Sequence, residues 1–168
     1  QLNSQYSLLI LTSDSALPEM LPGQFVEVRV DNSPTTFLRR PISINFVDYD
    51  TNELWLLVQI VGDGTRAMCE LKAGELVNVI LPLGNSFSYP VDTTKKVLLI
   101  GGGVGIAPLL YWGSKLNQGG FHCSFLLGGR STDNLLQLEE FSRYGTVYTT
   151  TEDGSYGEKG FVIHHSTL

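Results

Sequence analysis

Short runs of apolar and β-branched residues, separated by turn signals, dominate the first half of the chain. The runs read YSLLILTS, QFVEVRVD, PISINFVDYD, ELWLLVQIVG and ELVNVILP, with LPG, DNSP, DTNE and KAGE between them. Such runs with short connections predict the strands of an antiparallel barrel or sandwich. One helix is expected among them at residues 65–71, where Ala67 or Met68 and Leu71 would share a face.

After residue 85 the pattern changes. The polar stretch SYPVDTTKK suggests a domain boundary, and we place the two domains at residues 1–94 and 95–168. KVLLIGGG follows as an unalternated apolar run, which suits a strand buried on both faces. Helices are then expected at 105–116 and 134–141, with strands HCSFLLGG and TVYTTT after them. This β-α-β-α-β order predicts a parallel sheet with crossover helices, and so an antiparallel β-domain followed by an α/β domain.

Composition excludes several classes of partner. The 168-residue chain has a net charge of -6 and a pI near 4.9, so neither nucleic acid nor an anionic membrane surface is expected as a partner. No signal-peptide pattern opens the chain, and glycines and a proline interrupt its most apolar stretch, VLLIGGGVGIAPLLYW. Cys69 and Cys123 form no CxxC motif, so we expect reduced thiols in a cytoplasmic protein and no metal site.

The motif GGGVGIAP is the strongest sign of a ligand site. Its glycines end a predicted buried strand and begin a helix, where free backbone N–H groups and the helix dipole suit a pyrophosphate. The spacing is Gly103-x-Gly105-x-x-Pro108, with proline tolerated in the first helical turn. A tight turn without a ligand is the alternative, but the β-α-β context favours a nucleotide.

Two further stretches place anion-binding groups in the β-domain. VGDGT leads into the first helix, and Thr65 is expected either to cap that helix or to share its N–H groups with a phosphate. FLRRPISI sets Arg40 before Pro41, which restricts the backbone at the start of a strand. An arginine fork at that place suits a phosphate. For Arg39, a solvated surface role and a binding role remain open.

Taken together, these motifs resemble the ferredoxin–NADP reductase superfamily, and within it the electron-transfer subunits of NAD-linked dihydroorotate dehydrogenase. The likeness runs through the whole chain in order: PGQFV, RRPIS, VGDGT, LPLGNSF, GGGVGIAP, LLGGRS and TEDGSYGEKGF. The resemblance implies an FAD-binding β-barrel followed by an NAD(P)-binding α/β domain.

The resemblance also implies which residues hold FAD. The superfamily's Arg-x-Tyr-Ser flavin motif falls on Arg40, Pro41, Ile42 and Ser43. Arg40 would bind the pyrophosphate, Ile42 would lie against the isoalloxazine ring, and Ser43 would approach flavin N5 as the residue nearest the catalytic step. The remaining positions implied for FAD are Leu57, Val58 and Gln59 in a strand, and Gly64 with Thr65 in the second phosphate-binding turn.

A nicotinamide nucleotide would bind in the second domain. The positions implied for it are Gly102, Gly103, Gly105 and Pro108, with Arg130 and Ser131 near the adenosine ribose. An arginine at 130 could favour the 2′-phosphate of NADP, but the subfamily is NAD-linked, so NAD ranks first. The turn Glu152-Asp153 is either a further contact or a solvated loop.

The implied function is hydride transfer between the nicotinamide nucleotide and FAD, with electrons relayed to an FMN-containing dihydroorotate dehydrogenase catalytic subunit in pyrimidine biosynthesis. The family continues into a segment whose four cysteines hold a [2Fe–2S] cluster, and two cysteines cannot supply its ligands. We therefore expect a fragment with an incomplete nucleotide domain. The alternatives are a related flavin reductase subunit serving ferredoxin, sulfide or a hydrogenase, and a flavin-binding fragment without turnover.

Overall fold

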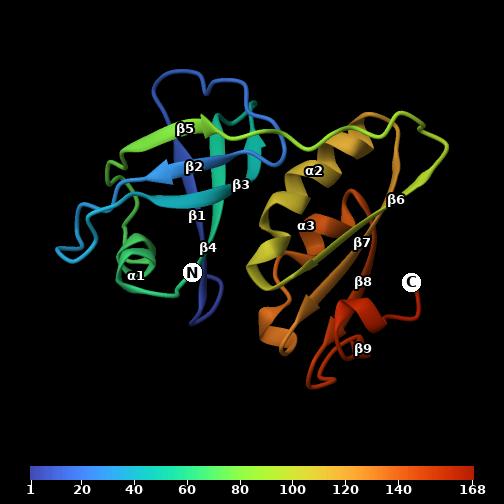
Figure 1. The fold of residues 1–168 in the computed structure, drawn as a ribbon. Coiled ribbons are helices and arrows are strands. Elements are labelled where there is room, and N and C mark those ends of the chain that lie inside the picture. Colours follow the sequence, from blue (N-terminus) through green and yellow to red (C-terminus); the bar gives the residue numbers. More distant parts are fainter. The chain divides into compact units, whose positions relative to one another are not determined.

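The computed structural model describes residues 1–168 and divides into two compact units, Gln1–Phe87 and Ser88–Leu168. The first unit is an antiparallel sheet of five strands in the order β1-β4-β3-β2-β5 (Figure 1). Its elements are β1 (Tyr6–Thr12), β2 (Phe25–Val28), β3 (Arg40–Asp48), β4 (Glu53–Gln59), α1 (Asp63–Cys69) and β5 (Val79–Leu83). All five predicted strands and the predicted helix are present, and α1 begins two residues earlier than expected.

Strand β3 belongs to both halves of this sheet. Its first residues, Arg40 to Ser43, pair with β2, whereas Ile44 to Asp48 pair with β4. The register against β4 shifts between Ile44 and Phe46, so the extra residue Asn45 forms a bulge. Bulges increase local twist and allow one strand to pass from one half-sheet to another. The sheet is therefore split between β3 and β4 at this point.

The second unit is a parallel sheet of four strands in the order β6-β7-β8-β9. Its elements are β6 (Lys96–Gly102), α2 (Ala107–Gln118), β7 (His122–Gly129), α3 (Leu138–Ser142), β8 (Gly145–Thr151) and β9 (Glu158–Lys159), with short 3₁₀ turns η1 (Gly103–Ile106), η2 (Thr132–Asn134) and η3 (Val162–His164). The fold class predicted from the sequence, an antiparallel β-domain followed by a parallel α/β domain, is confirmed.

Two elements differ from the sequence-based expectation. The predicted helix 134–141 is broken, because Leu135 is extended and Gln137 adopts a left-handed conformation with φ 57°. The break buries Leu136, which is 5% exposed. The short strand β9 was not anticipated, since two residues carry no periodic signal.

The two faces of the parallel sheet are covered by different segments. An added Cβ at Gly101 would touch Leu109 of α2, so α2 packs on that face. An added Cβ at Gly128 would meet Val162 of η3. Gly101 is paired in register with Leu127, so Gly128 points to the opposite face. No helix of the structure is long and apolar enough to span a membrane.

Candidate functional site

The split between β3 and β4 exposes backbone in the middle of the first unit. The pairing of β3 with β4 ends at Ile44 and Leu56, while β4 continues to Gln59 against β1 alone. Leu57 and Val58 are buried to 1% exposure, so their side chains are committed to the core. Every second residue of a strand turns its N–H and C=O groups to the same edge. The edge of residues 57–59 facing away from β1 therefore offers main-chain donors and acceptors.

The sequence-predicted residues Ile42 and Ser43 lie at the same split. Both belong to the half of β3 that pairs with β2, with Ile42 opposite Val26 and Ser43 opposite Phe25. Both side chains are half-buried. Ile42 and Ser43 thus border one side of the split, and the main chain of residues 57–59 borders the other.

Arg40 and Gly64, which are 24 positions apart in the printed sequence, lie in contact. An added Cβ at Gly64 would fall 3.2 Å from Cδ of Arg40 and 3.0 Å from Cγ2 of Thr36. Gly64 is buried, so a side chain at this position would collide with Thr36 and Arg40. The fold thus brings together the two phosphate-binding motifs predicted separately from the sequence.

The guanidinium of Arg40 has few bonding partners inside the protein. Its Nε donates to the carbonyl of Arg39 at 3.1 Å. The ion pairs of the structure involve Arg29 with Asp31 and His165 with Glu158, and no carboxylate pairs with Arg40. A half-buried arginine without an acidic partner is a donor fork available to an anion.

Arg39, whose role the sequence left open, is structural. Its guanidinium donates to the carbonyls of Glu27 (3.3 Å) and Asn78 (3.1 Å), and to the Asn78 side-chain oxygen at 2.6 Å. These bonds tie the start of β3 to β2 and to the segment before β5. The neighbouring arginines therefore have different tasks: Arg39 holds the sheet and Arg40 faces the candidate site.

Thr65 closes the turn before α1. Its hydroxyl accepts the N–H groups of Val61 (2.9 Å) and Gly62 (3.1 Å), and donates to the Gly62 carbonyl at 3.0 Å. The helix cap is Gly62 and not Thr65 as predicted; Thr65 is the third residue of the helix, and its hydroxyl accepts the main-chain N–H of the cap residue. The N–H groups of Asp63, Gly64 and Thr65 have no acceptor within the helix, as at any helix start.

Sequence reasoning missed the loop that completes this arrangement. Thr36 touches Gly64, and its hydroxyl is within 2.7 Å of the Ser33 hydroxyl. Asn32 donates to the Ala67 carbonyl at 3.2 Å, and Thr35 donates to Asp63 at 3.1 Å. The polar turn DNSPTT was used only as a strand separator. Its hydroxyl and amide side chains were the available signal that it packs against another segment.

In the second unit, the predicted glycines lie at the carboxyl end of the parallel strands. Gly103 requires its residue type, because its φ is +56°. Gly105 does not, since an added Cβ would meet nothing within 4 Å. Pro108 is in the first turn of α2, where a missing N–H costs no hydrogen bond. Gly102 and Gly105 are exposed, so backbone at this edge is open to a close-lying ligand.

Arg130 lies at the same edge, between two loops that are hydrogen bonded. The N–H of Asp153 donates to the Arg130 carbonyl at 3.2 Å. Ser155 joins the loops further: its hydroxyl donates to the Asp153 carboxylate at 2.6 Å and accepts the N–H of Thr132 at 2.9 Å. Bonds from Ser155 to the carboxylate hold the pKa of Asp153 below its usual value. Glu152 and Asp153 thus place two carboxyl groups on the loop beside Arg130.

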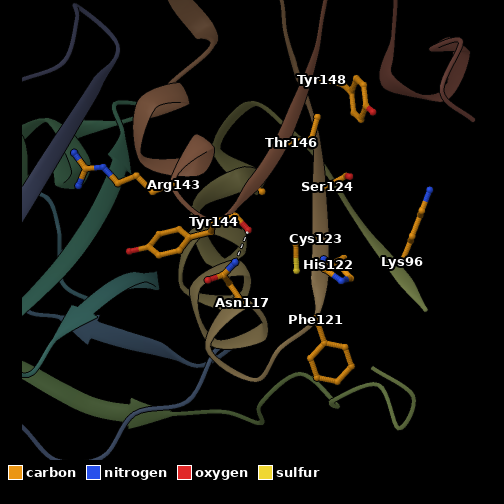
Figure 2. Close-up of a pocket in the computed structure, with 11 residues that line it drawn as sticks. Lys96, Asn117, Phe121, His122, Cys123, Ser124, Arg143, Tyr144, Thr146 and Tyr148 are labelled. Atoms are coloured by element: carbon orange, nitrogen blue, oxygen red, sulfur yellow. Dashed lines mark hydrogen bonds between the residues drawn. The ribbon is translucent and has the colours of Figure 1, made fainter. Parts of the chain in front are cut away.

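A pocket of about 550 Å³ lies at the opposite, amino-terminal end of the same sheet, as Figure 2 shows. Lys96, His122 and Tyr144 are among its lining residues, and Asn117 donates to the Tyr144 carbonyl at 3.3 Å across one side of it. Its residues include the first residues of β6, β7 and β8, whereas the glycine motif follows the carboxyl end of β6, the end at which ligands of parallel sheets bind. None of the residues predicted for the nucleotide lines it.

Neither cysteine shows the environment of a reactive or metal-bound thiol. Burial raises the pKa of Cys69 and of Cys123 above the ordinary thiol value. No group of three or more His, Cys, Asp or Glu side chains is placed to hold a metal ion.

Comparison with solved structures places this fold among ferredoxin–NADP reductase-like proteins. The NADH-dependent reduced ferredoxin-NADP oxidoreductase, described in work on flavin-based electron bifurcation, superimposes with a TM-score of 0.81 and 29% identity, covering 95% of this chain and 56% of that one. An Amycolatopsis cytochrome P450 reductase gives a TM-score of 0.78 at 25% identity, covering 94% of this chain and 51% of that one. Ferredoxin-NADP⁺ reductase from Plasmodium falciparum shares the fold, with a TM-score of 0.73, 16% identity, and coverage of 94% of this chain and 69% of that one.

Curated sequences give the particular resemblance. The dihydroorotate dehydrogenase B (NAD(+)) electron transfer subunit of Lysinibacillus sphaericus is 43% identical over 149 residues, which is 87% of this chain and 57% of that protein. The corresponding Bacillus mycoides subunit is 40% identical over 155 residues, 92% of this chain and 60% of that protein. No protein-family model matches. The resemblance predicted from the motifs is confirmed, and the chain spans about 60% of the length of these relatives.

Proposed function

We propose that the chain binds FAD in its first unit and a nicotinamide nucleotide in its second, as an electron-transfer component of a dihydroorotate dehydrogenase. The observation that carries the proposal is the contact between Arg40 and Gly64 beside the split of β3 from β4. One unpaired guanidinium, one closed glycine turn and one open strand edge match the pyrophosphate and the ring edge of a flavin dinucleotide.

The first unit supplies distinct groups to each part of FAD. Arg40 would hold the pyrophosphate, with the N–H groups at the start of α1 on its other side. Ile42 would support the flavin ring, and the Ser43 hydroxyl would lie near flavin N5. The main chain of residues 57–59 would hydrogen bond the polar edge of the ring. This fit rests on a guanidinium without an acidic partner, on the main-chain N–H groups of a helix start, and on a strand edge that β3 leaves unpaired.

The second unit would hold the nicotinamide nucleotide along Gly102, Gly103, Gly105 and Pro108. Gly105 supports this, because the fold gives no internal reason for a glycine there. Arg130 would lie near the adenosine ribose. The carboxyl groups of Glu152 and Asp153 on the neighbouring loop would oppose a 2′-phosphate, so we favour NAD over NADP.

When bound, the two cofactors supply the chemistry, a hydride passing between nicotinamide C4 and flavin N5. The protein's residues orient the reacting rings and neutralise phosphate charge, and the step needs no side chain as general acid or base. Ser43 would act by positioning the flavin at N5. The electrons would pass on to a dihydroorotate dehydrogenase catalytic subunit, the partner that the relatives' name as an electron transfer subunit implies, and we propose that this subunit carries FMN.

The absorption spectrum of the purified chain tests the proposal. After reconstitution with FAD, the visible absorption band of oxidised flavin should remain with the protein through gel filtration. Anaerobic NADH should bleach the band faster than NADPH. A chain that retains no FAD at micromolar concentration contradicts the flavin site, and a stable band that NADH cannot bleach contradicts the reductase role alone.

A further inference from the structure

Two large apolar side chains lie exposed directly before the Arg39-Arg40 pair. Phe37 is 92% exposed and Leu38 is 74% exposed. Burying a phenylalanine side chain stabilises a protein by about 1.5–3 kcal/mol relative to leaving it in water. The fold does not gain this stabilisation at Phe37, although hydrogen bonds hold the loop that precedes it.

The anchoring fixes where Phe37 begins. Thr36, its neighbour, touches Gly64 and is hydrogen bonded to Ser33 through both its main-chain N–H (3.0 Å) and its hydroxyl (2.7 Å). The backbone of Phe37 therefore starts next to the contact between Gly64 and Arg40. The exposed side chain of Phe37 thus starts beside the proposed pyrophosphate site.

The order of residues along the chain matches the order of groups in a dinucleotide. Ser43 and Ile42 border the strand split, Arg40 follows at the start of β3, and Phe37 comes three residues earlier. Thr36 and Arg40 both contact Gly64, so the chain between them bends around this glycine and keeps Phe37 close to Arg40. A dinucleotide with its flavin at the split and its pyrophosphate at Arg40 would have its adenine on the other side of the pyrophosphate, within reach of a side chain that starts beside Gly64.

We propose that Phe37 stacks on the adenine of FAD and so forms the adenine side of the cofactor site; this inference rests on the proposed function. The flat ring of phenylalanine can stack on any nucleobase, and one such stack changes the affinity for a ligand many-fold. Binding would cover the exposed ring. The Arg39 side chain, two residues further along the chain, is hydrogen bonded to Glu27 and Asn78, and Arg40 is assigned to the pyrophosphate, which leaves Phe37 as the flat side chain for the adenine.

The test is FAD affinity in a series of variants at one exposed position. Phe37→Ala should raise the Kd for FAD about 5- to 150-fold, the range expected for losing one base–aromatic stack. Phe37→Trp keeps a flat ring and should retain the wild-type Kd, whereas Phe37→Leu keeps apolar bulk only and should bind more weakly than Phe37→Trp. Ile10→Ala, which removes an exposed apolar side chain opposite Trp55 of β4, is the matched control and should leave the Kd unchanged.

The visible band of bound flavin gives a second readout. If Phe37 contacts adenine and not the isoalloxazine ring, the band should keep its position in Phe37→Ala protein saturated with FAD. A shifted band, an unchanged Kd in Phe37→Ala, or equal affinities of the Leu and Trp variants would each overturn the proposal. A wild-type chain that binds no FAD would instead overturn the proposed function, which is a separate result.

Discussion

The neighbouring arginines of FLRRPISI allow binding and folding to be tested separately. Arg40→Ala removes a guanidinium that pairs with no carboxylate, and Arg39→Ala removes one that makes three hydrogen bonds to Glu27 and Asn78. We expect Arg40→Ala to abolish tight FAD binding while leaving the fold intact. We expect Arg39→Ala to destabilise the first unit while leaving the FAD site intact.

The magnitudes follow from the contacts. Hydrogen bonds to a charged partner contribute about 1.5–3 kcal/mol each. Because Arg40 is partly exposed, we take about 3 kcal/mol for a bidentate pair with the pyrophosphate. Losing that pair in Arg40→Ala should raise the Kd for FAD about 100-fold. For Arg39, the acceptors are mostly exposed carbonyl and amide oxygens, so the loss of stability should be about 1–2 kcal/mol.

Two assays distinguish the variants. Calorimetric titration with FAD gives the Kd, and urea unfolding followed by Trp55 fluorescence in a Trp112→Phe background reports on the first unit, because Trp55 lies in β4. The reasoning is refuted if Arg39→Ala loses FAD and Arg40→Ala loses stability. It is also refuted if Arg40→Ala binds FAD as tightly as the wild type.

Three further predictions concern the second unit. Gly113→Ala should lower the unfolding free energy by about 1–2 kcal/mol, because the new Cβ would lie 2.5 Å from Cε1 of the buried Phe125. This collision outweighs the preference of helices for alanine over glycine, which is about 1 kcal/mol. Thermal unfolding shows whether the variant is less or more stable than the wild type. Gly105→Ala should leave the thermal midpoint unchanged but raise the Kd for NADH about tenfold, since its Cβ would point into space proposed for the nucleotide. Ser155→Ala should raise the pKa of Asp153 in a carboxyl NMR titration, because Ser155 supplies the bonds that lower it. Since the folded pKa of Asp153 is lowered, its contribution to the turn is present above the ordinary carboxyl pKa and lost as pH falls through the lowered value; a Ser155→Ala protein with an unchanged Asp153 titration contradicts this.

The fold class was accessible from the sequence because it depends on local patterns. Alternating apolar runs bounded by turn residues indicate strands, and an unalternated run such as KVLLIGGG indicates a strand covered on both faces. The prediction of a continuous helix at 134–141 was wrong because a local pattern was overridden by packing. The two leucines at 135 and 136 fit a helical face, but burial of Leu136 in the tertiary core favoured an extended backbone and a left-handed Gln137.

The sequence by itself determined the chemical types present: a guanidinium before proline, a glycine turn before a helix, and glycines at the end of a buried strand. It could not separate Arg39 from Arg40, because the choice depends on Asn78, which is 39 residues away. Nor could it show that Thr36 and Gly64 touch, or that β3 leaves β4 after Ile44. Contacts between distant residues arise only when the sheet closes, so the tertiary structure alone decided that Arg39 bonds Glu27 and Asn78 while Arg40 has no acidic partner.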